Sequence, residues 1–388
     1  MNPASVSDYR DLARRRLPPM FFEYIDGGSY AEVTLKRNVA DLEAIALRQR
    51  VMRDMSQLDL SIETLGQKLA FPVGLAPVGM AGMYGRRGEV QAARAAAGLG
   101  VPFCLSTVGV CSVEEVSASG TAPWFQLYML RDRGYMAELL ARAKAAGCPV
   151  LVFTVDLPLP GSRYRDVRSG FTGASGLSGA LNTAWQGATH PGWLWDVWLH
   201  GRPHTLGSVA NAVPKAGGVT DFLAWIASNF DRSVSWADLD WVRQTWDGPI
   251  VIKGVLDPQD ARDAVKAGAQ GLIVSNHGGR QLDGVRSSIS ALPAVADAVG
   301  GDLEVFLDGG VRSGLDVLKA LSLGAKACFV GRAWAYALGA GGEKMVARML
   351  GTLRSELATA MVLTGCRNAR DADRTLLDLA TWKNFSNP

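Results

Sequence analysis

A histidine and an arginine three residues apart mark the part of the sequence with the clearest chemistry. They are His277 and Arg280, in the run Ser275-Asn276-His277-Gly278-Gly279-Arg280, which follows an apolar stretch typical of a buried strand. Histidine accepts a proton near neutral pH, and the arginine guanidinium matches a carboxylate in shape and charge. The run predicts a site that holds a small acid and removes a proton from it. The alternative is a histidine that caps a helix beside a surface arginine.

Asp156 and Lys253 add charges at the ends of two other apolar runs. A carboxylate at the height of His277 would orient the imidazole and stabilise its protonated form. Lys253 closes the run Ile250-Val251-Ile252, and a buried lysine needs an anionic partner. An electron-rich flavin, a Schiff base or a neighbouring carboxylate would each meet that need.

Two glycine-rich segments follow the last two apolar runs. They are Asp308-Gly309-Gly310-Val311-Arg312 and Gly331-Arg332. Glycine backbone amides and arginines suit a phosphate monoester, and the last two strands of a barrel commonly end at a phosphate site. Tight turns with surface arginines would give the same pattern, but the position favours phosphate.

These residues need a scaffold that brings many strand ends together. Short apolar runs alternate with helical patterns, which predicts an α/β fold with a parallel sheet and right-handed crossovers. Eight runs favour a closed (β/α)8 TIM barrel over an open doubly wound sheet. The predicted strands are 72–79, 103–107, 124–129, 150–156, 250–255, 271–277, 304–310 and 327–332, and the predicted helices include 88–98, 134–146, 258–267, 290–299 and 313–323.

All eight predicted strands end in residues that line a rim. Active sites of such barrels are built from these ends. The end residues are Ala76, Pro77, Val78, Gly79, Ser106, Gln126, Tyr128, Thr154, Asp156, Lys253, Ser275, His277, Asp308, Gly309, Gly310, Gly331 and Arg332.

The sequence is interpreted as a single domain, 1–388, with two segments that lie outside the alternation of strands and helices. Residues 1–71 are expected to form an N-terminal helical layer before the barrel, 72–388. Residues 160–236 form a long insert after the fourth strand, rich in Gly, Ser and Trp. A loop this long in a compact domain is usually functional or disordered.

Composition excludes several classes of protein. A net charge of +3 over 388 residues gives no reason to expect nucleic acid as a partner. Five cysteines without a CxxC pair favour a reducing compartment, without a metal site or disulfide framework. Cys104, Cys111 and Cys328 lie in or beside apolar runs and are expected in the core. No signal peptide is expected, because residues 1–16 lack an apolar region, and no apolar run approaches the ~20 residues needed to span a bilayer.

The chain resembles the FMN-dependent L-2-hydroxy acid dehydrogenase and oxidase family over nearly its whole length. The resemblance lies in the combination of short motifs. They are Phe21-Phe22-Glu23-Tyr24-Ile25-Asp26-Gly27-Gly28, Ala76-Pro77, Phe125-Gln126-Leu127-Tyr128, Thr154-Val155-Asp156, Val251-Ile252-Lys253-Gly254, the run 275–281, Leu307-Asp308-Gly309-Gly310 and Val330-Gly331-Arg332.

The resemblance implies a role for each matching residue. His277 would be the base and Asp156 its partner, while Tyr128 would contact the substrate hydroxyl. Arg280, Tyr24 and Arg163 would bind or attract the substrate carboxylate. Lys253 would lie against the flavin N1–O2 edge and stabilise reduced FMN. The other FMN contacts would be Ala76, Pro77, Val78, Gly79, Ser106, Gln126, Thr154, Ser275, Asp308, Gly309, Gly310, Arg312, Gly331 and Arg332.

Within the family, the sequence is most similar to bacterial quinone-linked L-lactate dehydrogenases. Residues 80–90 and Arg202-Pro203-His204 carry that similarity, and Gly79 stands where many oxidases have alanine. Val108 stands where glycolate oxidases typically have tryptophan. L-Lactate is therefore the expected substrate and a quinone the expected acceptor. The alternatives are L-mandelate or another 2-hydroxy acid, an oxidase that uses O2, and, more distantly, another FMN- or phosphate-binding barrel.

The insert predicts contact with a membrane surface. Residues 190–200 contain three tryptophans in six positions, and tryptophan favours the membrane–water interface. The segment is too short to span, so we expect peripheral attachment at the cytoplasmic face of the inner membrane. A lid or a subunit interface is the alternative. The family also implies a homo-oligomer, commonly a tetramer.

Overall fold

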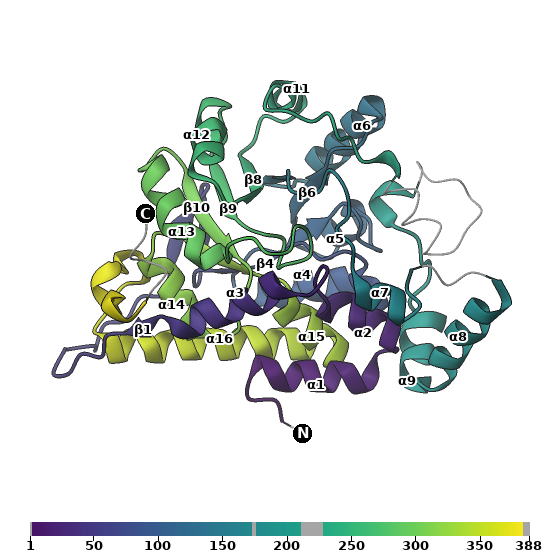
Figure 1. Ribbon diagram of the computed structural model, residues 1–388, viewed down its shortest axis with the longest axis horizontal. Coiled ribbons are helices and arrows are strands. Elements are labelled where there is room, and N and C mark those ends of the chain that lie inside the picture. Colours follow the sequence, from purple (N-terminus) through teal and green to yellow (C-terminus); the bar gives the residue numbers. More distant parts are fainter. Residues whose placement is uncertain (1, 173–175, 211–227, 383–388) are drawn as a thin grey trace.

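Eight parallel strands form the centre of the computed structural model, which describes residues 2–172, 176–210 and 228–382 (Figure 1). The strands follow the order β4-β11-β10-β9-β8-β7-β6-β5, and a parallel bridge between Leu75 and Phe103 joins the two ends. The predicted (β/α)8 barrel is therefore confirmed. The strands are β4 (Val73–Leu75), β5 (Cys104–Ser106), β6 (Trp124–Tyr128), β7 (Leu151–Thr154), β8 (Ile250–Val255), β9 (Gly271–Val274), β10 (Glu304–Asp308) and β11 (Ala327–Val330).

Helices follow the strands and cover the outside of the barrel (Figure 1). The five helices predicted by residue number lie within two residues of their expected bounds. Asp132, Asp257 and Ser313 cap three of them by accepting a bond from a backbone N–H of the first turn. The helices are α4 (Gly88–Gly98), α5 (Val113–Ser117), α6 (Arg133–Ala145), α11 (Asp238–Thr245), α12 (Pro258–Lys266), α13 (Ser288–Val299), α14 (Gly314–Ser322), α15 (Arg332–Gly341) and α16 (Glu343–Thr364).

The barrel interior is filled by large side chains away from the rim. The rings of Trp124 and Phe329 lie 5.2 Å apart, and Phe306 packs on both. A Cβ atom at Gly74 would lie 2.6 Å from the Phe329 ring, so glycine makes room for this layer. The five cysteines are buried and unpaired, and the expectation that Cys104, Cys111 and Cys328 belong to the core is confirmed.

The N-terminal segment lies along one side of the barrel, where α1 packs against α15 (Figure 1). It is helical only as far as Ala44, so the expected helical layer does not extend to residue 71. The positive φ angles of Leu65 and Gly66 instead allow a tight hairpin turn. The elements are α1 (Val6–Arg16), α2 (Pro19–Asp26), α3 (Val33–Ala44), β2 (Ile62–Thr64), β3 (Gln67–Leu69), and β1 (Ala46–Leu47) paired with β12 (Leu377–Asp378).

The predicted insert, 160–236, follows β7 and lies beside α2 (Figure 1). Its stretches 173–175 and 211–227 are outside the described residues. The Gly207 N–H donates to the carbonyls of Gly109 and Val110, which docks the insert on the loop after β5. Its elements are α7 (Tyr164–Arg168), α8 (Gly176–Ala188), α9 (Pro191–Trp193), the π-helical turn η2 (Leu194–Leu199) and η3 (Gly207–Val209).

Four short helical turns lie outside the insert. They are η1 (Ala81–Met83), η4 (Ala369–Asp371), η5 (Arg374–Leu376) and η6 (Leu379–Thr381).

Within residues 2–172, 176–210 and 228–382, no helix combines the length and the apolar character needed to cross a membrane.

Candidate active site

A cavity of about 420 Å³ opens where the strands end at their carboxyl side. Most of the residues singled out from the sequence line it. They are Tyr24, Ala76, Pro77, Val78, Gly79, Tyr128, Thr154, Arg163, Lys253, His277, Arg280, Asp308, Gly309, Gly310, Arg312, Gly331 and Arg332. Asp156, Ser106, Gln126 and Ser275 do not line it and lie behind, where each bonds to a neighbouring polar group.

The imidazole of His277 is bonded to a carboxylate from another strand end. Its Nδ1 lies 2.9 Å from Oδ1 of Asp156, which leaves Nε2 for a ligand. Burial would raise the pKa of Asp156, but the charges of His277 and Lys253 outweigh it and hold the pKa below its ordinary value. A Cβ atom at Gly254 would lie 2.6 Å from Asp156 Cγ, so the carboxylate fits because residue 254 is glycine.

Lys253 is buried and paired with a carboxylate. Its Nζ lies 3.1 Å from Oδ2 of Asp308 and donates to Oγ of Ser275 at 3.1 Å. Burial would lower the pKa of Lys253, but Asp308 and Asp156 outweigh it and raise the pKa above its ordinary value. Of the partners that the sequence suggested for Lys253, the structure contains the neighbouring carboxylate, that of Asp308. The Lys253 ammonium group is therefore a fixed positive charge at the cavity wall.

Two arginines approach the ring of Tyr24 at one end of the cavity. The guanidinium carbons of Arg280 and Arg163 lie 4.8 and 5.2 Å from the ring centroid. Arg280 donates to the carbonyls of Tyr24 and Gly27, and Arg163 Nε lies 3.0 Å from Oδ2 of Asp166. Two guanidiniums with donors facing one cavity make a site for a carboxylate.

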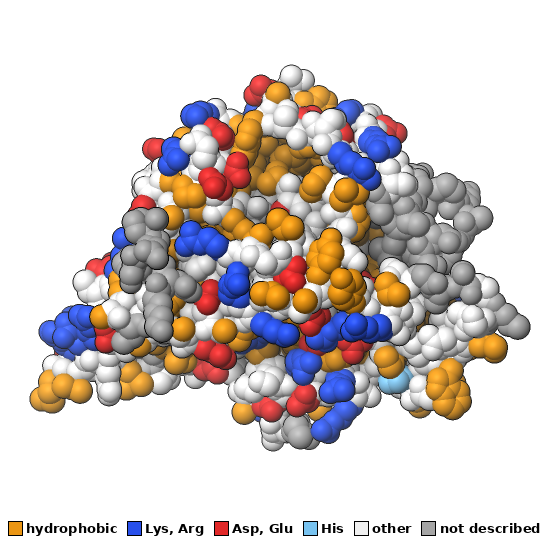
Figure 2. All heavy atoms as spheres, viewed as in Figure 1, with side chains coloured by type: hydrophobic (Ala, Val, Ile, Leu, Met, Phe, Trp, Pro, Cys, Tyr) orange, Lys and Arg blue, Asp and Glu red, His pale blue; other side chains and the backbone are white. Residues whose placement is uncertain are grey.

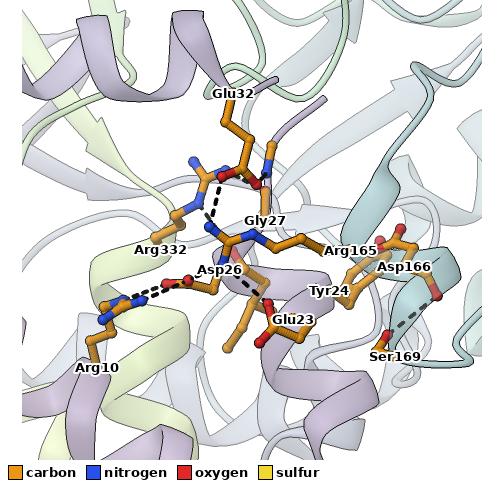
Figure 3. A network of polar contacts seen from close by, with 12 residues as sticks. Arg10, Glu23, Tyr24, Asp26, Gly27, Glu32, Arg165, Asp166, Ser169 and Arg332 are labelled. Atoms are coloured by element: carbon orange, nitrogen blue, oxygen red, sulfur yellow. Dashed lines mark hydrogen bonds and ion pairs between the residues drawn. The ribbon is translucent and has the colours of Figure 1, made fainter. Parts of the chain in front are cut away.

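A network of charges holds helix α7, just after Arg163, against helix α2, which carries Tyr24 (Figure 3). Arg165 lies 3.1 Å from Glu23, 2.7 Å from Asp26 and 2.7 Å from Glu32. Arg10 donates to both carboxylate oxygens of Asp26. The insert and the N-terminal helix are therefore joined next to the two arginines.

The glycine segments after β10 and β11 also line the cavity, and Arg332 lies next to this network (Figure 3). Gly309 and Gly310 have φ angles of +89° and +90°, which favour glycine. The guanidinium of Arg332 donates to the carbonyls of Ile25, Gly27 and Gly278. Three of its five guanidinium N–H groups are thus already engaged by the protein, and its backbone N–H lies in the first turn of α15.

Several buried polar atoms near the cavity have no hydrogen-bond partner among the described residues. They include Nε2 of Gln126, Oγ1 of Thr154 and Oδ1 of Asp308. Buried polar groups are normally paired, so each points to a bound polar group. One amide donor, one hydroxyl and one carboxylate oxygen beside the Lys253 cation fit the polar edge of a flavin and a ribityl chain.

Sequence reasoning missed several residues that line the cavity. Phe171 lies 4.7 Å from the Tyr24 ring, and Phe230 lies 5.3 Å from the Tyr128 ring. Both are aromatic residues of the insert, whose composition was the only available signal. Gln281, at the end of the histidine–arginine run, donates to the carbonyls of Asp156 and Leu159.

A family model described as FMN-dependent dehydrogenase matches residues 13–379. The chain belongs to the FMN-dependent dehydrogenase family. The L-lactate dehydrogenase of Chromohalobacter salexigens is 59% identical over 366 residues, which are 94% of this chain and 93% of that protein. The L-lactate dehydrogenase of Haemophilus influenzae is 57% identical over 379 residues, 97% of this chain and 99% of the relative.

Solved structures agree with this family. A monotopic membrane protein, (S)-mandelate dehydrogenase, has a TM-score of 0.90 and 32% identity, covering 97% of this chain and 100% of the other. A mandelate oxidase with (S)-4-hydroxymandelic acid has a TM-score of 0.83 and 39% identity, with coverage of 97% and 98%. This FMN-dependent dehydrogenase is accordingly an oxidoreductase that takes FMN as cofactor and a 2-hydroxy acid as substrate.

Proposed function

We propose that this FMN-dependent dehydrogenase oxidises L-lactate to pyruvate, with His277 as the base. The observation that carries the proposal is the convergence of the His277–Asp156 pair and the two arginines on one cavity. The names of the relatives with 56–59% identity support L-lactate as the substrate.

The substrate carboxylate would bind between Arg280 and Arg163, beside Tyr24. Arg280 is held in place by the carbonyls of Tyr24 and Gly27, so its remaining donors stay directed at the ligand. Burial raises the pKa of Tyr128 far above its ordinary value, which keeps its phenol protonated and able to donate to a substrate oxygen.

His277 would take the proton that the oxidation releases. Its Nε2 receives the proton whether it leaves Cα or the hydroxyl group, and the Asp156 carboxylate stabilises the resulting imidazolium. FMN, when bound, accepts the two electrons that leave the substrate. The buried Lys253 cation would stabilise negative charge that develops at the wall of the site.

The residues that would hold FMN are those around the unpaired polar atoms and the glycine segments. We assign them as Ala76, Pro77, Val78, Gly79, Ser106, Gln126, Thr154, Lys253, Ser275, Asp308, Gly309, Gly310, Arg312, Gly331 and Arg332. For Arg332 we assign the backbone rather than the guanidinium, because the guanidinium bonds to three carbonyls.

We further propose that electrons pass to a quinone at the cytoplasmic face of the inner membrane. Within a single domain, 1–388, the insert 160–236 would make the contact. Trp185 and Trp195 are 70% and 65% exposed, and Figure 2 shows separate hydrophobic side chains among white atoms at the lower right, where α8 and α9 lie. Trp193 is instead buried and donates to the Met83 carbonyl. The monotopic relative supports membrane attachment, and the family resemblance supports a homotetramer.

Membrane attachment can be separated from catalysis. A variant with Trp185→Ser and Trp195→Ser should float with anionic phospholipid vesicles less than the wild type, with unchanged turnover of L-lactate with a soluble dye. Equal flotation of both proteins would reject the contact.

The base is tested by His277→Gln. This variant should retain FMN, seen in its visible spectrum, and lose at least about 10²-fold in kcat because general base catalysis is removed. Near-normal turnover would reject the assignment of His277.

Mandelate oxidation is the second candidate. The aromatic rings of Phe171 and Phe230 at the cavity wall would accommodate a phenyl group, and the mandelate enzymes among the solved structures favour it. The ratio of kcat/KM for L-lactate and L-mandelate decides between the two substrates. Fast reoxidation by air in the same assay would identify an oxidase.

A further inference from the structure

Two buried amide side chains form a reciprocal pair behind the cavity. Asn38 lies on α3, and Asn276 precedes His277 in the loop after β9. Asn38 Nδ2 donates to Asn276 Oδ1 at 2.8 Å, and Asn276 Nδ2 donates to Asn38 Oδ1 at 2.7 Å. Their exposed fractions are 1% and 5%, so water does not compete for these bonds.

Neighbouring backbone groups fix the orientation of both amides. Asn276 Oδ1 accepts a bond from the Gly279 N–H, and its Nδ2 donates to the Arg286 carbonyl. Asn38 Oδ1 also accepts a bond from the Ser288 N–H. Rotating either amide by 180° would place donors against donors, and the pair therefore has a single arrangement.

The glycine segment after β10 packs against the same pair and against the backbone of Asn38. A Cβ atom at Gly309 would lie 3.4 Å from Asn38 Nδ2 and 3.5 Å from Asn276 Oδ1, and one at Gly310 would lie 2.1 Å from the main-chain carbonyl oxygen of Asn38. Asn38 therefore contacts the loop after β10 as well as the loop that carries His277.

His277 needs such support because its backbone is strained. Its φ angle is +57°, a left-handed conformation that costs a residue with a side chain about 1 kcal/mol or more. The Ser275 hydroxyl accepts a bond from the His277 N–H on one side, and the Asn276 side chain fixes the loop on the other. A loop held in a strained conformation relaxes when its anchors are removed.

We infer that Asn38 is a positioning residue, which sets His277 through Asn276 and the Gly309–Gly310 segment by direct packing. The inference rests on the proposed function for the role of His277, and independently on the FMN site for the role of the glycines. Asn38 touches neither the cavity nor the assigned substrate groups, and acts only through the loops it holds.

The variants N38A and N38D test this. N38A should lower kcat about 10- to 100-fold with less than about 3-fold change in KM, because a small displacement of the base affects the chemical step more than carboxylate binding. Its Kd for FMN, measured by flavin fluorescence, should rise about 10-fold. K36A, an exposed change on the same helix, should leave both quantities unchanged.

N38D adds a readout that a merely structural role would not produce. In this variant, an ionised carboxylate would place an acceptor oxygen against Oδ1 of Asn276, which is itself an acceptor. A protonated carboxyl group would instead donate a hydrogen bond to Asn276 Oδ1 and restore the pair. The kcat ratio of N38D to N38A should therefore rise as the pH falls from 8 to 5.5. The charged groups on the elements around this position are present in both variants, and they enter the ratio by shifting the pKa of the new carboxyl group: Arg37, Asp41, Asp283, Arg286, Asp308 and Lys319.

The outcomes separate the two proposals. Turnover and FMN affinity of N38A within 2-fold of the wild type, with a flat N38D to N38A ratio, would overturn the positioning role. If N38A does not fold, the ratio of N38D to the wild type over the same pH range decides. If the wild type oxidises no 2-hydroxy acid, the proposed function fails, and the FMN affinities of N38A and K36A still decide the role of Asn38.

Discussion

Nδ1 of His277 lies 2.9 Å from Oδ1 of Asp156, although the two residues are 121 positions apart. They follow β9 and β7, and β8 lies between these strands and carries Lys253. Asp156 thus lies near the His277 imidazole and the Lys253 cation, and its Oδ2 has no hydrogen-bond partner among the described residues. This arrangement keeps the carboxylate ionised next to the proposed base.

Replacing Asp156 by asparagine should lower kcat about 10²- to 10⁴-fold, because a neutral amide does not stabilise the imidazolium. FMN content should stay near that of the wild type, since Asp156 does not line the cavity. Steady-state kinetics with L-lactate and the flavin absorbance of the purified variant measure both. A kcat within 3-fold of the wild type would remove Asp156 from the mechanism.

Replacing Gly79 by alanine should raise KM about 3- to 10-fold. The new methyl group would lie 2.8 Å from Val108 Cγ2 and 3.3 Å from the Tyr24 hydroxyl, so the cavity wall must shift by a few tenths of an ångström. Gly98→Ala is the matched control, because a Cβ atom there has no neighbour within 4 Å and alanine favours a helix by about 0.5–1 kcal/mol. Equal KM values for the two variants would contradict the steric argument.

Replacing Arg165 by methionine should lower the free energy of unfolding by about 1–3 kcal/mol. The change leaves Glu23, Asp26 and Glu32 without a shared cation, and partial exposure of the network keeps the loss below that of a fully buried pair. Thermal unfolding of the holoenzyme measures the effect. Arg168→Met, on the same helix but exposed, should change Tm little, and an equal loss in both variants would contradict the role of the network.

Stability should depend on pH through Asp26. Burial would raise its pKa, but Arg10, Tyr336 and Arg165 outweigh it and lower the pKa from 3.8 to about 2. Because the folded pKa is the lower one, the contribution is complete above pH 4 and is lost as the pH falls towards 2. Above pH 4, the difference in Tm between wild type and Asp26→Asn should correspond to a difference of about 2 kcal/mol in the free energy of unfolding. This difference should shrink as the pH falls below 4. A difference independent of pH would contradict the lowered pKa.

Much of the fold follows from local patterns. The strands are apolar runs because both faces of a parallel strand in a barrel are buried, and their last residues are polar because they reach the rim. His277, Lys253 and Asp308 were predicted together for that reason, and their strands do end at one cavity. Seven of the eight strands were predicted too long, because loop residues such as Gly79 and His277 continue the run without backbone pairing, whereas the predicted bounds 250–255 match those of β8.

Other features depend on contacts between distant segments. Asn38 shows nothing unusual in its own helix, and its role emerges only from the amide of Asn276. Phe230 reaches the cavity from the end of the insert, and Trp193 belongs to the core although its neighbour Trp195 is exposed. Arg332 matched a phosphate motif, but the carbonyls of residues that precede it by some 300 positions occupy its guanidinium. Contacts between distant segments follow no periodic pattern in the sequence, so the sequence alone does not predict them.

The most direct test of the proposed reaction is the visible spectrum of the holoenzyme, followed anaerobically as L-lactate is added. The account predicts rapid bleaching of the flavin band, formation of one pyruvate per flavin, and reoxidation by a quinone much faster than by air. A flavin band that L-lactate leaves unchanged, in a protein that carries FMN, would contradict it.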